Sequence, residues 1–262
     1  MTRVAIIGAE ISGLACARQL AKAGVSVVVF DKGRGIGGRV ATRRAGDLQF
    51  DHGAPFVRAQ RDDFSALLAS LTVDGSAVPW TDDKGVTWTV GSPSMSAIPK
   101  AMGVGLDVRL GTQILKVNAN QSGWHLHYDE TEYVATHIVV TVPKPQIAGL
   151  LGYTHPLIPQ IADVKMEPGL TLMATVTGTT PSITPFLPDD PLALITCDSS
   201  KPNRPLNESS SWVAQAGTEF SVTHLEKNLP DIAALMLPLL CERLDATLGR
   251  ITHAVAHRWR YS

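Results

Sequence analysis

Residues 1–31 constrain the fold of this chain more than any other segment. The run RVAIIGA (3–9) is apolar and ends in glycine, as a strand buried on both faces does. It is followed by ISGLACARQLAKAG, whose apolar residues recur at helical spacing and which closes at Gly24, and then by the β-branched run VSVVVFD. Strand, helix and strand in this order predict the first unit of a doubly wound dinucleotide-binding fold.

The turn between the first strand and the helix carries a glycine pattern. Dinucleotide-binding turns have the pattern G-x-G-x-x-G, and here it reads GAEISG. Gly8 and Gly13 take the first and third glycine positions, and Glu10 takes the middle one. Asp31 ends the second strand, where its carboxylate can accept hydrogen bonds from an adenosine ribose and disfavours a 2′-phosphate. The sequence therefore predicts a nucleotide-binding fold.

Glu10 departs from this pattern. Its side chain occupies space where a diphosphate normally meets the helix N-terminus, and its charge opposes that of the ligand. Alternatively, the carboxylate can turn onto the helix N-terminus and act there as an internal anion. In both cases we expect the affinity for a dinucleotide to fall.

The segment KGRGIGGRVATRR (32–44) is rich in glycine and arginine and is predicted to be a loop. Its Gly37, Gly38 and Arg39 give a flexible segment that can bind an anion, since a guanidinium pairs bidentately with phosphate. Taken alone, such a segment is more simply interpreted as a solvated basic loop. Its position directly after Asp31 favours phosphate binding.

The rest of the chain shows alternating strand and helix patterns. We expect a helix at 60–72, a hairpin at 77–91, a three-stranded antiparallel meander at 106–142, strands at 170–177, 192–197 and near Trp212, a loop at 199–211, a helix at 231–248 that Pro238 kinks or divides, and a strand from 251.

Composition excludes several classes of protein. The formal net charge is −1 and no basic block is present, which argues against nucleic acid as a partner. No apolar run is long enough to span a membrane, and the start, MTRVAIIGAE, lacks the layout of a secretion signal. The three cysteines are far apart and odd in number, so we expect no disulfide framework, no metal site and a cytoplasmic location.

Several longer motifs extend the pattern along the chain. They are FDKGRGIGGRVATRR, LQFDHGAPF, GSPSMSAIPKAM (91–102), HIVVTVPKPQ (137–146), VKMEPGLTLMATV (164–176) and AHRWRY (256–261). With these motifs in this order, the chain resembles the flavin-containing amine oxidase superfamily and, within it, the bacterial renalase-like proteins.

The resemblance implies an α/β fold similar to that of p-hydroxybenzoate hydroxylase, in which a Rossmann-type FAD-binding domain is interleaved with a substrate domain built on an antiparallel sheet. We therefore expect residues 1–68 and 99–150 to form the FAD-binding domain, and residues 69–98 and 151–262 to form the substrate domain. Relatives continue beyond HRWRY with a Gly-Asp motif that binds the ribityl-phosphate of FAD. The expectation is that this chain lacks that C-terminal segment.

The resemblance also implies the chemistry. Members of the family bind FAD noncovalently, and the best-understood ones oxidise isomeric dihydronicotinamide dinucleotides. A small-molecule substrate of this kind, or an amine-like one, would give a hydride to the flavin, and oxygen would be the acceptor. Hydride transfer is the chemistry of the cofactor, so no residue needs to be a general acid or base.

Carried over by position, the resemblance places the glycine turn at the FAD diphosphate, Asp31 at the ribose, the HGAPF segment beside the isoalloxazine and the backbone of Val117 at the adenine. The cofactor-binding residues implied in this way are Gly8, Ala9, Glu10, Ile11, Ser12, Gly13, Asp31, Lys32, Gly38, Arg39, Gly53, Ala54, Pro55, Phe56 and Val117.

Histidines need separate consideration. His125 and His127 alternate on a predicted strand, and we expect two solvated side chains rather than a metal site, because no carboxylate or third ligand has suitable spacing. His52 can touch flavin or substrate, or make a structural hydrogen bond. His257 and Arg258 lie where the family's substrate cavity is walled, and ordinary strand packing is the competing interpretation.

Three functions stay open at this point. The first is an FAD-dependent oxidoreductase of the renalase-like type, favoured by Asp31, the GGR loop and the HGAPF segment. The second is a noncatalytic remnant of that family with weak or no FAD binding, favoured by Glu10 and the early end of the chain. The third, an NAD-dependent dehydrogenase, is disfavoured by the GGR loop after the second strand.

Overall fold

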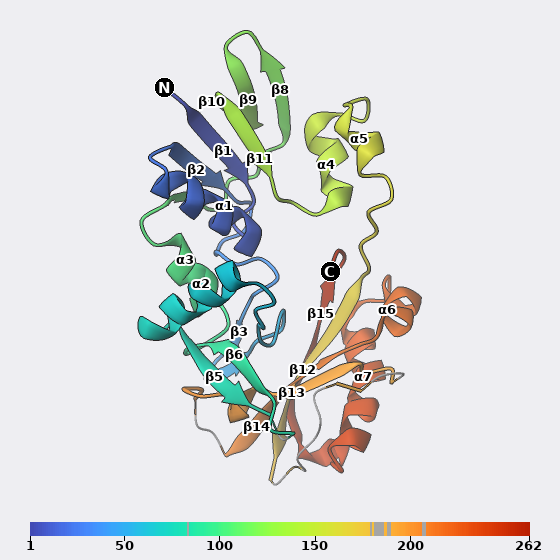
Figure 1. Ribbon diagram of the computed structural model, residues 1–262. Helices are drawn as coiled ribbons and strands as arrows, with labels where there is room; N and C mark the ends of the chain where they lie inside the picture. The colour runs from blue at the N-terminus through green and yellow to red at the C-terminus, as the bar shows by residue number, and fades with distance from the viewer. Residues whose placement is uncertain (83, 179, 181–185, 188–189, 206–207) are drawn as a thin grey trace. The chain divides into compact units, whose positions relative to one another are not determined.

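The computed structural model describes residues 1–262 except 83, 179, 181–185, 188–189 and 206–207, and it divides into two compact units (Figure 1). Unit 1 comprises residues 1–38 and 99–166, and unit 2 comprises residues 39–98 and 167–262. These units differ from the expected domains in two stretches, since residues 39–68 belong to unit 2 and residues 151–166 to unit 1. The functional roles expected of the two domains stay predictions.

Unit 1 is built on the predicted strand-helix-strand segment. A four-stranded parallel sheet has the order β11 (His137–Val140), β1 (Arg3–Ile7), β2 (Ser26–Phe30) and β7 (Asp107–Arg109). Helix α1 (Ile11–Lys22) connects β1 to β2 and is followed by Gly24 in a left-handed conformation. The predicted strands, helix and helix stop are confirmed.

The second sheet of unit 1 corrects one prediction. Its antiparallel strands are β8 (Lys116–Asn120), β9 (Gly123–Tyr128) and β10 (Thr131–Ala135). The expected three-stranded meander at 106–142 is wrong in its first and third strands, because each run divides and contributes an outer piece, β7 or β11, to the parallel sheet. The third run divides at Thr136, whose N–H and hydroxyl both donate to the Arg3 carbonyl. The sequence pattern is continuous across this residue, although the strands before and after it belong to different sheets.

The remaining elements of unit 1 are α4 (Lys144–Leu151), α5 (Leu157–Gln160) and the end of α3 (Ala97–Gly103). Its core combines residues from both sheets with one from α4 and one from the connection between β7 and β8. The buried members are Ala5, Ile7, Val28, Phe30, Ile114, Val117, Leu126, Ala135 and Leu150.

Unit 2 contains an antiparallel sheet with the order β13 (Leu194–Cys197), β14 (Ser209–Gln215), β12 (Gly169–Thr177) and β15 (Ile251–Trp259). Helices α6 (Thr218–His224) and α7 (Leu229–Arg243) pack on one face. The other face is covered around Phe50, which packs on Met173 and Val213. The predicted strands are present, with small shifts of their ends.

Two expectations for unit 2 need correction. The last helix ends at Arg243 rather than 248, is followed by a short 3-10 turn η2 (Leu248–Arg250), and is not divided at Pro238. The tract 199–211 is not wholly a loop, because it overlaps a 3-10 turn η1 (Asp198–Ser200) and ends inside β14. Residues 206 and 207 of that tract lie outside the described residues.

The N-terminal part of unit 2 contains two hairpins and a helix. The elements are β3 (Arg43–Ala45), β4 (Leu48–Phe50), α2 (Asp62–Val73), β5 (Ala77–Thr81) and β6 (Thr87–Gly91). They confirm the predicted helix and hairpin, of which residue 83 lies outside the described residues. The predicted loop at 32–44 ends two residues early, at the start of β3. Across the described ranges, no helix combines the length and apolar character needed to cross a membrane.

Candidate nucleotide turn and candidate cavity

The glycine turn of unit 1 has the backbone geometry that its pattern predicts. Gly8 has φ of 113°, and its N–H donates to the Phe30 carbonyl at 2.8 Å. A Cβ at Gly8 would lie 2.6 Å from Thr141 Oγ1, and one at Gly13 would lie within 3.0 Å of the Gly8 carbonyl. A side chain at Gly8 would therefore clash with Thr141, and one at Gly13 would push α1 away from the turn.

Thr141 holds this turn from the end of β11, and sequence reasoning missed it. Its hydroxyl lies 3.0 Å from the Ile7 carbonyl and 3.2 Å from the Gly8 carbonyl, so it can donate to either. The only available signal was its place after the apolar run HIVV, at the carboxyl end of a parallel strand, where ligand sites occur in such sheets.

Asp31 lies beside the turn. Its Oδ2 accepts from the Ala9 N–H at 2.6 Å, and its Oδ1 accepts from the Gly33 N–H at 2.7 Å. A carboxylate oxygen has two lone pairs, so each oxygen can still accept from a ribose hydroxyl. The next residue, Lys32, is exposed and its Nζ lies 3.5 Å from Gln146 Oε1.

Glu10 is the residue before α1, and its side chain lies over Gly38. Its Cγ, Cδ and Oε1 are all within 3.0 Å of the position that a Cβ would take at Gly38, whose φ is 51°. The Gly37 N–H donates to the Ala9 carbonyl at 3.0 Å, which ties the GGR loop to the turn. The Glu10 side chain makes no capping hydrogen bond to α1, so the alternative of a carboxylate turned onto the helix end is not found.

The other predicted residues of unit 1 have clear positions. Ile11 and Ser12 form the first turn of α1, where Ser12 is exposed. Val117 lies in β8 with its side chain in the core, so only its backbone is available to an adenine. Gly8, Gly13 and Asp31 fit the turn and the adenosine end of a dinucleotide. The diphosphate does not fit while Glu10 covers Gly38.

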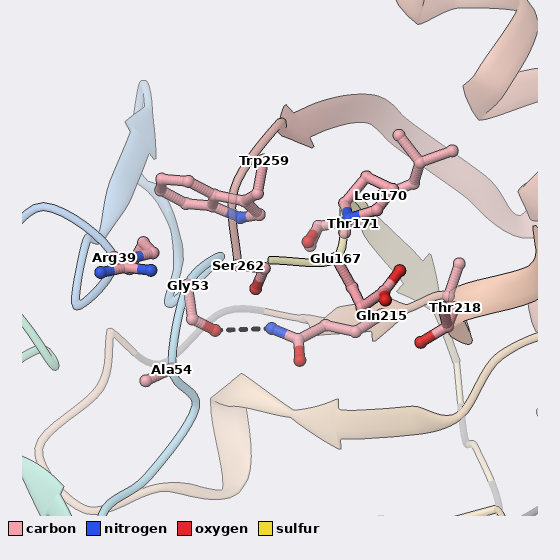
Figure 2. A pocket seen from close by; sticks show the side chains of 13 residues that line it. Arg39, Gly53, Ala54, Glu167, Leu170, Thr171, Gln215, Thr218, Trp259 and Ser262 are labelled. Carbon is pink, nitrogen blue, oxygen red and sulfur yellow. Dashed lines mark hydrogen bonds between the residues drawn. The ribbon is translucent and has the colours of Figure 1, made fainter. Parts of the chain in front are cut away.

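Unit 2 contains a cavity of about 350 Å³ (Figure 2), within the range of small-molecule sites. It is lined from two parts of unit 2. The segment 39–98 contributes Arg39, Gly53 and Ala54, and the antiparallel sheet contributes Thr171, Gln215 and Trp259. Its other lining residues are Glu167, Pro168, Gly169, Leu170, Ala216, Thr218 and Ser262.

Pairing of the strands explains why the polar side chains meet there. Thr171 of β12 is opposite Gln215 of β14 on one side and His257 of β15 on the other, so the three residues form one row across the sheet. Gln215 Nε2 donates to the Gly53 carbonyl at 2.6 Å, as Figure 2 shows. Arg39 NH1 donates to the Tyr261 carbonyl at 3.4 Å.

Aromatic stacking supports Trp259. Its indole N–H donates to the His52 carbonyl at 3.1 Å, and its ring stacks on that of His52 with centroids 5.3 Å apart. The ring of His257 contacts both, at 4.7 Å from His52 and 4.4 Å from Trp259. His52 and His257 therefore stand behind Trp259 and are not part of the cavity lining.

The surroundings of both histidines favour the neutral imidazole. Burial, together with electrostatic repulsion from His257 and Arg43, lowers the pKa of His52 to about 4. Burial and Arg43 also lower the pKa of His257. The cavity therefore has an uncharged aromatic wall beside the polar row.

Three further predicted residues point elsewhere. Phe56 stacks on Trp88 of the β5–β6 hairpin at 4.2 Å, and neither it nor Pro55 lines the cavity. Arg258 donates from NH2 to the Lys227 carbonyl and is likewise outside the lining. These placements leave the cofactor roles of Pro55 and Phe56 as predictions.

A buried charge cluster lies next to Gly53 in the chain and was not predicted from the sequence. It consists of Asp51, Asp198, Lys201 and Arg204, whose side chains are at most 2% exposed. Asp51 Oδ2 accepts from Lys201 Nζ at 3.1 Å and from Arg204 NH2 at 2.6 Å. The Asp51 N–H donates to Asp198, which also pairs with Lys201. A polar tract with no apolar periodicity gave no signal that Lys201 and Arg204 would be buried.

Two carboxylates and two cations balance in this cluster. Burial alone would raise the pKa of Asp51, but Lys201 and Arg204 outweigh it and hold this pKa below its ordinary 3.8. Burial raises the pKa of Asp198 despite the opposing attraction of Lys201. Asp51 directly precedes His52 and Gly53, so the cluster anchors the segment that carries one wall of the cavity.

The expectation of two solvated histidines on β9 is wrong for His125. Its Nδ1 lies 3.0 Å from Glu132 Oε2, and its Nε2 lies 2.8 Å from Ser122 Oγ. Its side chain is 12% exposed. The carboxylate comes from the neighbouring strand β10, which spacing within one strand cannot show. In the part of the chain that the structure describes, no three His, Cys, Asp or Glu side chains form a metal-binding group.

Comparison with known proteins supports this fold. Residues 6–71 match the family described as the NAD(P)-binding Rossmann-like domain. A protein of Mycobacterium tuberculosis named as a flavin-containing monoamine oxidase, AofH, is 36% identical over 70 residues, which are 27% of this chain and 15% of the relative. The matched stretch thus covers only a small part of that relative.

Solved structures extend the likeness to nearly the whole chain. Cyclohexylamine oxidase from Brevibacterium oxydans has a TM-score of 0.77 at 13% identity, covering 98% of this chain and 84% of that one. A protein from Exiguobacterium named as a protoporphyrinogen oxidase has a TM-score of 0.77 at 12% identity, covering 98% and 86%. The predicted fold, a Rossmann-type unit combined with an antiparallel-sheet unit, is confirmed.

Proposed function

We propose that this chain is an FAD-dependent oxidoreductase of the renalase-like type. The observation that carries the proposal is the turn of unit 1, where Gly8, Gly13 and Asp31 combine the close helix packing and the ribose acceptor of a dinucleotide site. This turn lies within the residues that match the Rossmann-like family. The flavin-containing relative supports a flavin over a nicotinamide as the resident cofactor.

In this proposal the residues of unit 1 hold the adenosine end of noncovalently bound FAD. Asp31 accepts from the ribose hydroxyls, and its charge disfavours a 2′-phosphate. The edge backbone of β8, at Val117, faces the adenine. Bound flavin would supply the chemistry, by accepting a hydride from a substrate carbon and passing the electrons to oxygen with release of peroxide.

The cavity of unit 2 is the proposed binding place for the reacting part of the substrate. Thr171 and Gln215 offer a hydroxyl and an amide oxygen, and the neutral His52 and His257 keep the wall behind Trp259 uncharged. These groups suit a carboxamide-bearing ring such as a dihydronicotinamide, or a small amine. They bind and orient the substrate and move no proton.

The test begins with the visible spectrum of the purified protein during titration with FAD. We expect the bands of the added flavin to shift on binding, and to bleach without oxygen when a reduced nicotinamide isomer or an amine is added. Readmitting oxygen should restore the colour and produce peroxide. Heat-denatured protein with FAD is the control.

A variant tests the cavity separately. Thr171→Val should raise KM about tenfold by removing one hydrogen bond to the substrate, with unchanged FAD absorbance. Thr87→Val, on the exposed hairpin, is the matched control and should leave KM unchanged. A folded protein that leaves the bands of added FAD unshifted would contradict the proposal. If it then binds NAD it is a dehydrogenase, and if it binds neither it is a noncatalytic remnant.

A further inference from the structure

Glu10 stands at the point where the two glycine segments of unit 1 meet. The turn at 8–13 and the GGR loop are joined by the hydrogen bond from Gly37 to Ala9, and the Glu10 side chain fills the space directly over Gly38. Gly38 has no Cβ, and only for this reason does the carboxyl group fit there.

A dinucleotide needs this space for its diphosphate. The middle position of the glycine pattern is normally a glycine because the backbone must come close to the two phosphates. Glu10 adds a side chain and a negative charge at that position, next to a ligand group that itself carries negative charge. Asp31 and the backbone around it lie outside this obstruction and remain available to the ribose.

We propose that Glu10 is a specificity-determining residue that weakens binding of the diphosphate, so that FAD is a dissociable ligand of this chain rather than a permanently held cofactor. This inference rests on the proposed flavin function, and it adds that the protein exchanges its flavin with solution. The nucleoside end is bound normally, and the diphosphate is bound only when Glu10 moves off Gly38.

The size of the effect follows from charge and volume together. A like charge at about 5 Å from each phosphate in a partly solvated site weakens binding by about tenfold to a hundredfold. Displacing the side chain from Gly38 adds to this. Removing only the charge should therefore recover part of the affinity, and removing the whole side chain should recover more.

The experiment measures dissociation constants for adenosine, ADP and FAD by calorimetry, with the wild type and the variants Glu10→Gln, Glu10→Ala and Glu10→Gly. Glu130→Gln, at an exposed turn of the same unit, is the matched control. We expect Glu10→Gly to bind ADP and FAD at least tenfold more tightly, Glu10→Gln to be intermediate, and adenosine binding to be the same in all. Wild-type protein should lose its flavin on desalting, and Glu10→Gly should keep it.

The possible outcomes separate the two proposals. Equal FAD and ADP affinities in wild type and Glu10→Gly would overturn the role of Glu10, and flavin binding by both would leave the oxidoreductase function standing. A gain for ADP without any FAD binding would support the role of Glu10 and contradict the flavin function. An equal gain for adenosine would also overturn the inference, because the effect would not belong to the diphosphate. Glu10→Ala, which has less backbone freedom than glycine, checks that any gain is not caused only by the flexibility of glycine at this position.

Discussion

At the scale of single residues, Asp51 has the largest expected influence on stability. Asp51 lies two residues before Gly53 of the cavity and pairs with Lys201 and Arg204, which are 150 and 153 residues later in the chain. Forming such a buried cluster is neither clearly favourable nor unfavourable, since desolvation offsets the attraction. Removing one member is different, because it leaves buried charges without compensation.

We therefore expect Asp51→Asn to lower the free energy of unfolding by about 3–5 kcal/mol. Urea denaturation at neutral pH measures this change. Asp107→Asn is the control, because it removes an exposed ion pair with Arg109 and should cost less than about 1 kcal/mol. A loss for Asp51→Asn no larger than the control's would mean that the cluster is solvated in solution.

The same variant should alter the response to acid. The folded pKa of Asp51 lies below 3.8, so its ionised form stabilises the fold above the unfolded pKa, and this contribution is lost as pH falls through the folded pKa. The raised pKa of Asp198 acts with the opposite sign, stabilising at low pH and losing effect as pH rises through the folded value. Without Asp51, the unfolding free energy should decline less steeply below about pH 4 than in the wild type.

At the scale of elements, local patterns predicted what local interactions determine. The strand-helix-strand segment, the glycine turn and the hairpin at 77–91 each depend on neighbouring residues, and each is present in the structure. The prediction for 106–142 failed because two of its three runs divide between the sheets. The third run divides at Thr136, which is hydrogen-bonded to Arg3, 133 residues earlier in the chain. Burial of Lys201 was likewise set by a carboxylate far away in sequence.

Part of the candidate site could be predicted from local sequence patterns, and part could not. Glycine spacing predicted the turn, and Asp31 followed from the length of the strand-helix-strand unit. The cavity could not be predicted from spacing, because Thr171, Gln215 and Trp259 meet only through the register of three strands. Only the resemblance to a family placed Gly53 and Ala54 near a ligand.

Helix α7 offers a test at this scale, because Pro238 lies inside it and is exposed. Proline lacks the N–H that would donate to the carbonyl of Ala234, so Pro238→Ala should restore this hydrogen bond without leaving a cavity. We expect the unfolding free energy of the protein to rise by about 1–3 kcal/mol. Urea denaturation provides the measurement.

Pro230 is the matched control in the same helix. It lies in the first turn, where N–H groups have no partner within the helix, so Pro230→Ala should change stability by less than about 1 kcal/mol. Equal effects of the two substitutions would show that the helix is already distorted enough at Pro238 to accommodate proline without loss.

At the scale of the whole molecule, neither compact unit is a continuous piece of chain. Unit 1 needs β11 beside β1, and the hydrogen bond between Arg3 and Thr136 spans 133 residues. Unit 2 takes its central sheet from 167–262 and the cover for one face of that sheet from 39–98. Folding of each unit must therefore bring distant segments together, which favours slow folding.

The sheet of unit 2 makes this dependence testable. The segment 167–262 contains all of the core between the sheet and α7. It lacks Phe50, which covers Met173 and Val213 on the opposite face of the sheet. It also lacks Asp51, which pairs with Lys201 and Arg204. Expressed alone, it should collapse without cooperative unfolding and should bind the dye ANS on the uncovered face. Co-expression with 39–98 should restore a cooperative transition and abolish dye binding. A segment 167–262 that unfolds cooperatively and leaves the dye unbound would contradict this view, because its sheet would then be stable with one face exposed.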